Sequence, residues 1–549
     1  MRNIIILILL IFPFLLDGQS QITSRPKLIV GIVIDQMRPD YLTRYNNKFG
    51  DSGFKRILKS GFYCRNTQFN YAPTYTGPGH ASIYTGTTPS LHGITGNDWY
   101  DQLAMDTVYC TQDTSVRAVG GEGKEGKEGM MSPHRLLTTT LTDQLRLSTQ
   151  MKAKVIGISL KDRGAILPAG RSADAAYWYD GKSGNWITST WYRNDLPKWA
   201  HEFNDRKWPE QYLSKPWNTA LPIKEYYESD PDDSPYEAVF RGEEKPVFPH
   251  DLPALKGIGY DLVRRTPFGN TLTKDFALSA ILGEKMGADS VPDFLCISFS
   301  ATDYVGHQFG PNAIETEDTY IRLDRDIADL LTFLDNRIGQ GAYLLFMTAD
   351  HACMENPKHM LDHKLAAGFS NPTIIKDTIR YFFKGKYGKP NTCNAISMIR
   401  FISMKPSSCK INLMFALLSL NLAIFLRKSI PGIMDIMTAC NLQEEEYNEL
   451  FRNRIQKGFH TGRSGNVCLL FSPGWTDPLY GGDGTQGTTH GSPYPYDAHV
   501  PLLWYGWHIP AGATADEVNI TDIAPTLSFL LNITLPNGCT GKKINALVK

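Results

Sequence analysis

The chain has 549 residues, of which 42% are hydrophobic and 11% aromatic, and this is ample for a large buried core. Lysine plus arginine and aspartate plus glutamate both total 56, so no net field draws the protein to nucleic acid or to an anionic membrane. Nine cysteines without a Cys-x-x-Cys pair indicate neither a zinc ribbon nor a dense disulfide scaffold. Cys64 and Cys110 could still pair in an oxidising compartment.

The chain begins like a secretory signal peptide. Arg2 precedes the apolar run Ile4–Leu16, and small residues follow at Gly18 and Ser20. A membrane anchor is the alternative, but the run is shorter than the ~20 residues that a spanning helix needs. We therefore expect residues 1–20 to be a signal peptide and residues 21–549 to be a periplasmic or secreted catalytic domain with no stable membrane span.

The segment Tyr71–Gly86, YAPTYTGPGHASIYTG, is open to two interpretations. Gly and Pro often mark surface turns, so the run Gly77–Gly79 after Thr76 could be a loop. Alternatively, Thr76 is a nucleophile at the start of a helix. Pro78 would then suit the first helical position, where free N–H groups and the helix dipole favour a phosphate.

Four apolar segments predict buried parallel strands that end in polar residues. Continuous apolar runs of this length are typical of strands covered by helices on both faces. Between the last two, apolar residues recur at helical spacing from Tyr320 to Ile338, and Gly339 stands where a helix C′ residue belongs. The pattern predicts an α/β fold with a mostly parallel central sheet, whose ligands bind at the carboxyl ends of the strands. The four segments are KLIVGIVIDQ, which reaches Asp35, AKVIGISLKDR, which reaches Lys161 and Arg163, DFLCISFSATD, which ends at Asp303, and YLLFMTADH, which ends at Asp350 and His351.

Two stretches look like cap insertions rather than core layers. Residues 178–253 are rich in Trp, Tyr, Pro and charge but lack sustained periodicity. Residues 387–457 are the second, and within them Asn391–Asn441 contains one acidic residue and the uncharged run Ile411–Leu426. This 16-residue run with two Asn is a poor transmembrane helix, and its composition predicts exposed hydrophobic surface. The stretch is either a divergent cap element or a segment translated in a shifted reading frame.

Aspartate and histidine residues gather at the predicted strand ends in a pattern that suits metal ions. Asp303 and His307 are four apart, so one helical turn presents both on the same side. Each residue alone would be an ordinary cap or polar side chain, but six candidate ligands recur in matched contexts. Mixed Asp and His ligation suits Zn²⁺, and two ions could clamp the attacking and leaving oxygens of a phosphoryl transfer. One ion could take Asp303, His307 and His490, and a second could take Asp35, Asp350, His351 and the oxygen of Thr76.

The motifs PTYTGPGHASIYTG, SLKDRGAILPAG, SATDYVGHQFG, TADH and GTTHGS resemble the alkaline phosphatase superfamily. More narrowly, they are similar to its secreted branch with a threonine nucleophile and a Lys-x-Arg phosphate clamp. The resemblance covers most of residues 24–386 and 458–549. One departure is Ala352, where the family commonly has glycine. The resemblance implies family roles for Asp35, Thr76, Asn97, Lys161, Arg163, Asp303, His307, Asp350, His351 and His490.

These observations predict an exported two-zinc alkaline phosphatase that hydrolyses small phosphate monoesters through a phosphothreonine intermediate on Thr76. Asn97 would donate to a phosphate oxygen. Lys161 and Arg163 would hold the charge that a monoester has and a diester lacks. The rivals are a related phosphodiesterase or nucleotide pyrophosphatase, a sulfatase, disfavoured because the nucleophile region lacks Cys-x-Pro-x-Arg, and an inactive pseudoenzyme.

Overall fold

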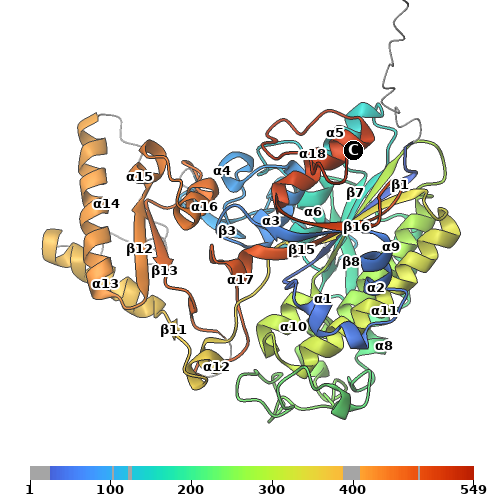
Figure 1. Cartoon of the computed structure of the whole chain (residues 1–549), viewed down its shortest axis with the longest axis horizontal. Coiled ribbons are helices and arrows are strands. Elements are labelled where there is room, and N and C mark those ends of the chain that lie inside the picture. The colour runs from blue at the N-terminus through green and yellow to red at the C-terminus, as the bar shows by residue number, and fades with distance from the viewer. Residues whose placement is uncertain (1–24, 102–103, 122–125, 388–408, 480–482, 549) are drawn as a thin grey trace, which may run out of the picture.

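A computed structural model describes residues 25–101, 104–121, 126–387, 409–479 and 483–548. The expected signal peptide therefore lies outside the described residues. A ten-stranded sheet forms the centre of the molecule (Figure 1). Its strands follow in the order β16 (Gly512–Asn519), β2 (Phe62–Gln68), β15 (His499–Gly506), β10 (Tyr343–Thr348), β1 (Leu28–Ile34), β9 (Asp293–Phe299), β6 (Val155–Ser159), β7 (Ala175–Asp180), β8 (Asn185–Ser189) and β5 (Ala118–Val119).

The middle of this sheet is parallel, as the apolar runs predicted. Strands β10, β1, β9, β6 and β7 pair in parallel register, and antiparallel strands flank them. Every residue of β1, β6, β9 and β10 is buried, because helices cover both faces of the sheet. The α/β fold class is confirmed.

Two layers of helices enclose the sheet (Figure 1). The predicted helix before β10 is present as α11 (Ile314–Arg337), and Gly339 follows it with φ +108°, a conformation that favours glycine. One layer contains α3 (Thr76–Thr85), α5 (Leu141–Ser148), α6 (Asp162–Ala169) and α18 (Ile523–Leu531), and the other contains α2 (Phe54–Ser60), α9 (Phe268–Gly283), α10 (Ala301–Phe309) and α11.

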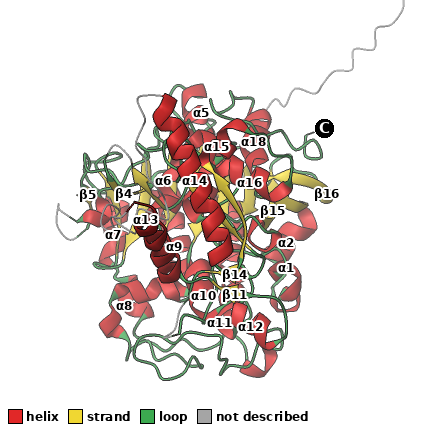
Figure 2. Ribbon diagram, turned by 90° about the vertical axis from the view of Figure 1, so that its left-hand side faces the viewer, coloured by secondary structure: helices red, strands yellow, loops and turns green. Residues whose placement is uncertain are grey.

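A second lobe, which we define as residues 368–387 and 409–476, stands beside the sheet (Figures 1 and 2). Its strands β12 (Ile433–Thr438) and β13 (Val467–Phe471) form an antiparallel pair. An apolar cluster that includes Ile375, Leu422 and Val467 packs α13 and α14 against this pair. A separate cluster joins Met437 and Leu470 to the main body. The lobe's helices are α13 (Pro372–Tyr387), α14 (Cys409–Ser429), α15 (Ala439–Glu444) and α16 (Leu450–Gly458), and the short strands β11 (Gly368–Phe369) and β14 (Trp475–Thr476) pair at its base.

The structure corrects the expected insertion boundaries. The stretch 178–253 begins inside the central sheet, with the end of β7 and all of β8, and its Trp186, Trp217 and Phe240 belong to the main hydrophobic core. Trp186 lies in β8, whereas Trp217 and Phe240 lie outside the named helices and strands and are buried without a helical or strand period. The stretch expected to be the second insertion, 387–457, falls within the second lobe, which also includes α13 and β13.

Two further expectations concern cysteines and membranes. Cys64 and Cys110 are separate buried thiols, so the suggested disulfide is absent. Among the described helices, none combines the length and the apolar character needed to cross a membrane. The expected exposed hydrophobic surface is present on α14, where Leu417, Leu420 and Ile424 are about half exposed.

Candidate metal centre and nucleophile

Four adjacent parallel strands deliver the central polar side chains. Asp35 directly follows β1, Asp350 follows β10 by two residues and Lys161 follows β6 by two residues. Asp303 lies in the first turn of α10, just after β9. Because β10, β1, β9 and β6 are neighbours in the sheet, their carboxyl ends converge on one place, as predicted for ligand binding in such sheets.

The candidate ligands form two overlapping groups. Asp303, His351 and His490 bring one ligand atom each within 4.8 Å of one another, and so do Asp35, Asp350 and His351. His307 adjoins the first group, with Nε2 3.2 Å from Asp303 Oδ1. The structure thus brings together all six predicted Asp and His ligands, with His351 between the two groups.

Each of the three histidines is oriented by a backbone carbonyl. Nδ1 of His307 donates to the Thr488 carbonyl at 2.8 Å, and Nδ1 of His490 donates to the Thr74 carbonyl at 2.7 Å. Nδ1 of His351 donates to the Ala352 carbonyl at 3.1 Å. A carbonyl only accepts, so the proton is on Nδ1 and the lone pair of each Nε2 faces the carboxylates. Metal-binding histidines are typically oriented in this way.

The carboxylates carry more negative charge than their neighbours balance. Asp35 is fully buried, its Oδ1 accepts no hydrogen bond, and burial with the nearby Asp303 and Asp350 raises its pKa well above the usual range. Burial alone would also raise the pKa of Asp303, but His307 in its doubly protonated form and the Lys161 ammonium hold that pKa well below its usual range. Three buried carboxylates beside three imidazole lone pairs fit divalent cations, and the mixed oxygen and nitrogen donors suit zinc.

Lys161 and Arg163 make different contacts. The Lys161 ammonium is 2.7 Å from Asp35 Oδ2 and 2.5 Å from Asp303 Oδ2, so here it bridges two candidate ligands. Arg163 donates through Nη1 to the hydroxyl of Tyr109 at 2.8 Å. Sequence reasoning missed Tyr109, because nothing in its local sequence marks it as a partner of a residue 54 positions later.

Thr76 is the first residue of α3, as the helix interpretation predicted. Its Oγ1 lies 3.4 Å from Nε2 of His351, and the residue is 1% exposed. The next N–H, that of Gly77, donates to Asn97 Oδ1 at 2.8 Å. Pro78 is the third helical residue rather than the first, a position that proline tolerates because N–H groups of the first turn have no helical acceptor.

Glycine lets α3 approach the strand end. A Cβ at Gly79 would lie 2.3 Å from the backbone oxygen of Asp350. Alanine at position 352, where the family commonly has glycine, has no such cost. Ala352 has no positive φ, and its N–H donates to the Asp497 carbonyl at 2.8 Å.

Two supporting residues of the site complete its hydrogen bonds. Gln36, which has φ +67°, donates through its backbone N–H to Asp350 Oδ1 at 3.2 Å and through Nε2 to Asp303 Oδ1 at 2.8 Å. Sequence reasoning missed it, although it directly follows Asp35. Nδ1 of His80 donates to the Thr76 carbonyl at 2.9 Å and lies 3.4 Å from Asp350 Oδ2. Both residues therefore position the proposed ligands and nucleophile.

Comparisons with known proteins agree with this geometry. A family model described as type I phosphodiesterase / nucleotide pyrophosphatase matches residues 29–493. A Myroides odoratus protein named calcium-transporting ATPase is 44% identical over 96% of each chain, and alkaline phosphatase PafA of Elizabethkingia meningoseptica is 41% identical, also over 96% of each. A crystal structure of wild-type alkaline phosphatase PafA superposes with a TM-score of 0.89 at 40% identity, covering 96% of this chain and 100% of that one.

Proposed function

The chain belongs to the type I phosphodiesterase / nucleotide pyrophosphatase family, and from this premise we propose that it is an alkaline phosphatase that hydrolyses phosphate monoesters. Near-full-length similarity to alkaline phosphatase PafA supports this activity. The observation that carries the proposal is the convergence of Asp and His side chains at the strand ends beside Thr76 Oγ1.

The proposed metal content is two zinc ions. Asp303, His307 and His490 would hold one, and Asp35, Asp350 and His351, with the oxygen of Thr76, would hold the other. Zinc bound there would supply positive charge that lowers the pKa of a nearby hydroxyl and stabilises charge developing on the phosphoryl and ester oxygens. The backbone-fixed imidazoles support this assignment, because their Nε2 atoms need no rearrangement to act as ligands.

Thr76 is the proposed nucleophile. Its Oγ forms a bond to phosphorus as the bond from phosphorus to the ester oxygen breaks, and the alcohol leaves. Water then attacks the phosphothreonine, so that phosphate departs and the threonine hydroxyl is restored. The position of Thr76 at the start of α3 supports this role, since the positive end of the helix dipole favours a phosphoryl group.

Asn97, Lys161 and Arg163 are the proposed phosphoryl ligands. The Gly77 N–H occupies Asn97 Oδ1, which leaves the Asn97 amide N–H groups to donate to a phosphoryl oxygen. Lys161 would exchange a carboxylate partner for the non-bridging phosphoryl charge, and Arg163 would bind the same charge from the Tyr109 side. Such paired cations favour a dianionic monoester over a diester. We also propose export, with residues 1–20 as the signal peptide.

Turnover of matched esters by the purified mature protein tests the proposal. We expect phenyl phosphate to be hydrolysed far faster than diphenyl phosphate, with zinc required for both. Preference for the diester would instead favour a phosphodiesterase, and absence of turnover on either ester by the zinc-loaded protein would favour a pseudoenzyme.

A further inference from the structure

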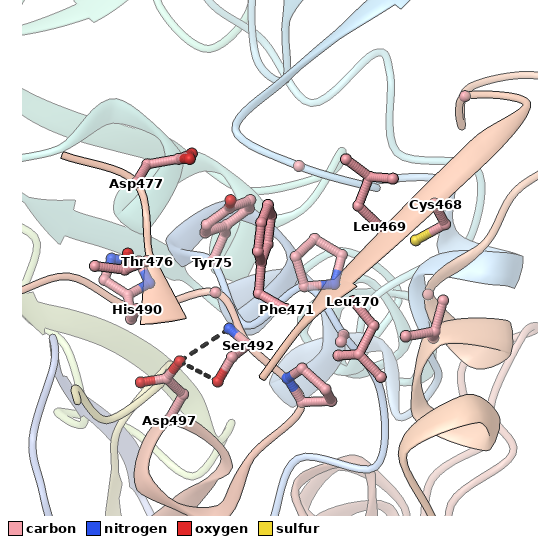
Figure 3. Close-up of a pocket in the computed structure, with 18 of the residues that line it drawn as sticks. Tyr75, Cys468, Leu469, Leu470, Phe471, Thr476, Asp477, His490, Ser492 and Asp497 are labelled. Atoms are coloured by element: carbon pink, nitrogen blue, oxygen red, sulfur yellow. Dashed lines mark hydrogen bonds between the residues drawn. The ribbon is translucent and has the colours of Figure 1, made fainter. Parts of the chain in front are cut away.

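A cavity of about 480 Å³ opens between the main body and the second lobe, beside the candidate nucleophile. Tyr75 and His490 line it from the main body, and Ile375, Phe471 and Trp475 line it from the lobe. The close-up in Figure 3 shows Tyr75, Phe471 and His490 among the residues that line the cavity. Tyr75 directly precedes Thr76, and His490 is a proposed metal ligand, so the cavity is continuous with the proposed phosphoryl site.

Tyr75 is held at the boundary between the two sites. Its ring meets the His490 ring edge-on, with 5.7 Å between the ring centroids. A Cβ at Gly491, where φ is +124°, would lie 2.4 Å from this ring. Glycine at 491 therefore lets the Tyr75 ring lie close to the backbone that carries His490.

The lobe presents its aromatic residues from a fixed backbone. The Trp475 indole lies against Gly368 and Gly432, where an added Cβ would come within 2.6 Å and 2.1 Å of the ring. Its strand β14 pairs with β11. Phe471 ends β13, and its carbonyl accepts a 2.6 Å hydrogen bond from the hydroxyl of Tyr494 in the main body. These contacts fix the Trp475 indole and the backbone of Phe471, which lowers the entropy cost of stacking a ligand on the two rings.

The charges around the cavity disfavour an anionic occupant. Asp98 and Asp477 line it, and so does Asp497, whose pKa burial raises to about 7. Arg463 is the one Lys or Arg side chain among the described lining residues, and its Nη1 donates to the carbonyls of Gly93 at 2.6 Å and Arg135 at 2.7 Å. The walls thus combine aromatic surface with an excess of carboxylates.

We propose that this cavity binds the leaving group of the monoester and selects one that is aromatic and uncharged. The inference rests on the proposed phosphatase function and adds a substrate class to it. The volume is typical of a small-molecule site, and flat rings gain most from stacking against Phe471, Trp475 and Tyr75. A nucleoside base and a simple aryl ring share this chemistry.

The test compares kcat/KM for phenyl phosphate, adenosine 5′-monophosphate, n-hexyl phosphate and methyl phosphate in the zinc-loaded enzyme. The variants are Phe471→Ala, Trp475→Ala and the conservative Trp475→Phe. We expect each alanine variant to lower the ratio of phenyl to methyl phosphate turnover by about tenfold, and Trp475→Phe to restore most of it. Using ratios to methyl phosphate removes the intrinsic reactivity of each ester and any general loss of active enzyme. Tyr381→Ala is the matched control, because Tyr381 is a 71% exposed lobe aromatic outside the cavity lining.

Each outcome separates the cavity inference from the phosphatase proposal. A parallel fall for the adenosine ester identifies nucleoside monophosphates as a source of the ring, and an unchanged adenosine ratio restricts the source to simpler aryl esters. Unchanged ratios for both aromatic esters, or an equal loss on n-hexyl phosphate, overturn the aromatic selectivity even if the enzyme remains a phosphatase. No monoester turnover by the wild-type enzyme overturns the phosphatase function itself.

Discussion

The carboxyl ends of the central strands and the second lobe bury different kinds of side chain. At the strand ends, buried carboxylates such as Asp35 and Asp350 lie among imidazoles and the Lys161 ammonium, on strands with no exposed residue. In the lobe, α14 buries Leu422 at 1% exposure and leaves Leu420 at 48%. The comparison shows that strand ends fix chemical groups, whereas the lobe contributes shape and apolar surface.

Removal of metal should have the largest effect on activity, and it should act at the strand ends rather than in the lobe. Chelation should abolish phosphatase turnover, and added zinc should restore it at two ions per chain, because only the strand ends contain the ligand groups found among the described residues. Metal analysis alongside phenyl phosphate turnover checks this. One tightly bound ion per chain at full activity would contradict the two-metal assignment.

Thr76→Ala should lower turnover by at least about 10³-fold, since removing a catalytic nucleophile costs far more than removing a binding contact. Inorganic phosphate binding and zinc content should persist. The control is Thr85→Ala in the same helix, whose hydroxyl donates only to the Ala81 carbonyl. Near-wild-type rates for Thr76→Ala would reject the nucleophile interpretation of the Tyr71–Gly86 segment.

The double variant Lys161→Ala/Arg163→Ala should lower monoester turnover by at least ~10²-fold, because charge-assisted hydrogen bonds are worth about 1.5–3 kcal/mol each. Diester turnover should change far less. Lys154→Ala, at the opposite end of β6, is the matched control, since Lys154 donates to the Glu284 carbonyl. Equal losses on both esters would mean that the pair supports the metal ligands, with which Lys161 is in contact in this structure.

The smallest effects on activity should come from α14. Leu422→Ala should destabilise the lobe by about 2–4 kcal/mol through lost burial, while Leu420→Ser should stay within about 0.5 kcal/mol and reduce aggregation. Calorimetric unfolding and light scattering measure both. Loss of zinc from Leu422→Ala would show that metal binding at the strand ends depends on the lobe. Peptide mass mapping that recovers residues 409–429 from active native enzyme would reject the shifted-frame alternative.

The sequence by itself determined where the chemistry lies along the chain. Apolar runs ending at Asp35, Asp303 and Asp350 are local features, and the rule that parallel strands align their carboxyl ends is enough to bring them together. The helix before β10 and its terminating Gly339 were predictable for the same reason, because periodicity and a positive φ are encoded within a few residues.

Only the tertiary structure decided which groups meet across long stretches of chain. His490 reaches the strand ends from a loop more than a hundred residues after Asp350, and Gln36 and Tyr109 acquire their roles only through partners distant in sequence. Aromatic residues within 178–253 belong to the main hydrophobic core. Their burial follows from tertiary packing, because this stretch has no sustained hydrophobic periodicity that would predict it. The Trp475 indole likewise depends on glycines at 368 and 432, whose small size matters only once folding brings them to the ring. The local sequence pattern specifies a helix or strand and where it ends. Which helices and strands contact one another is decided by the free energy of the whole folded chain.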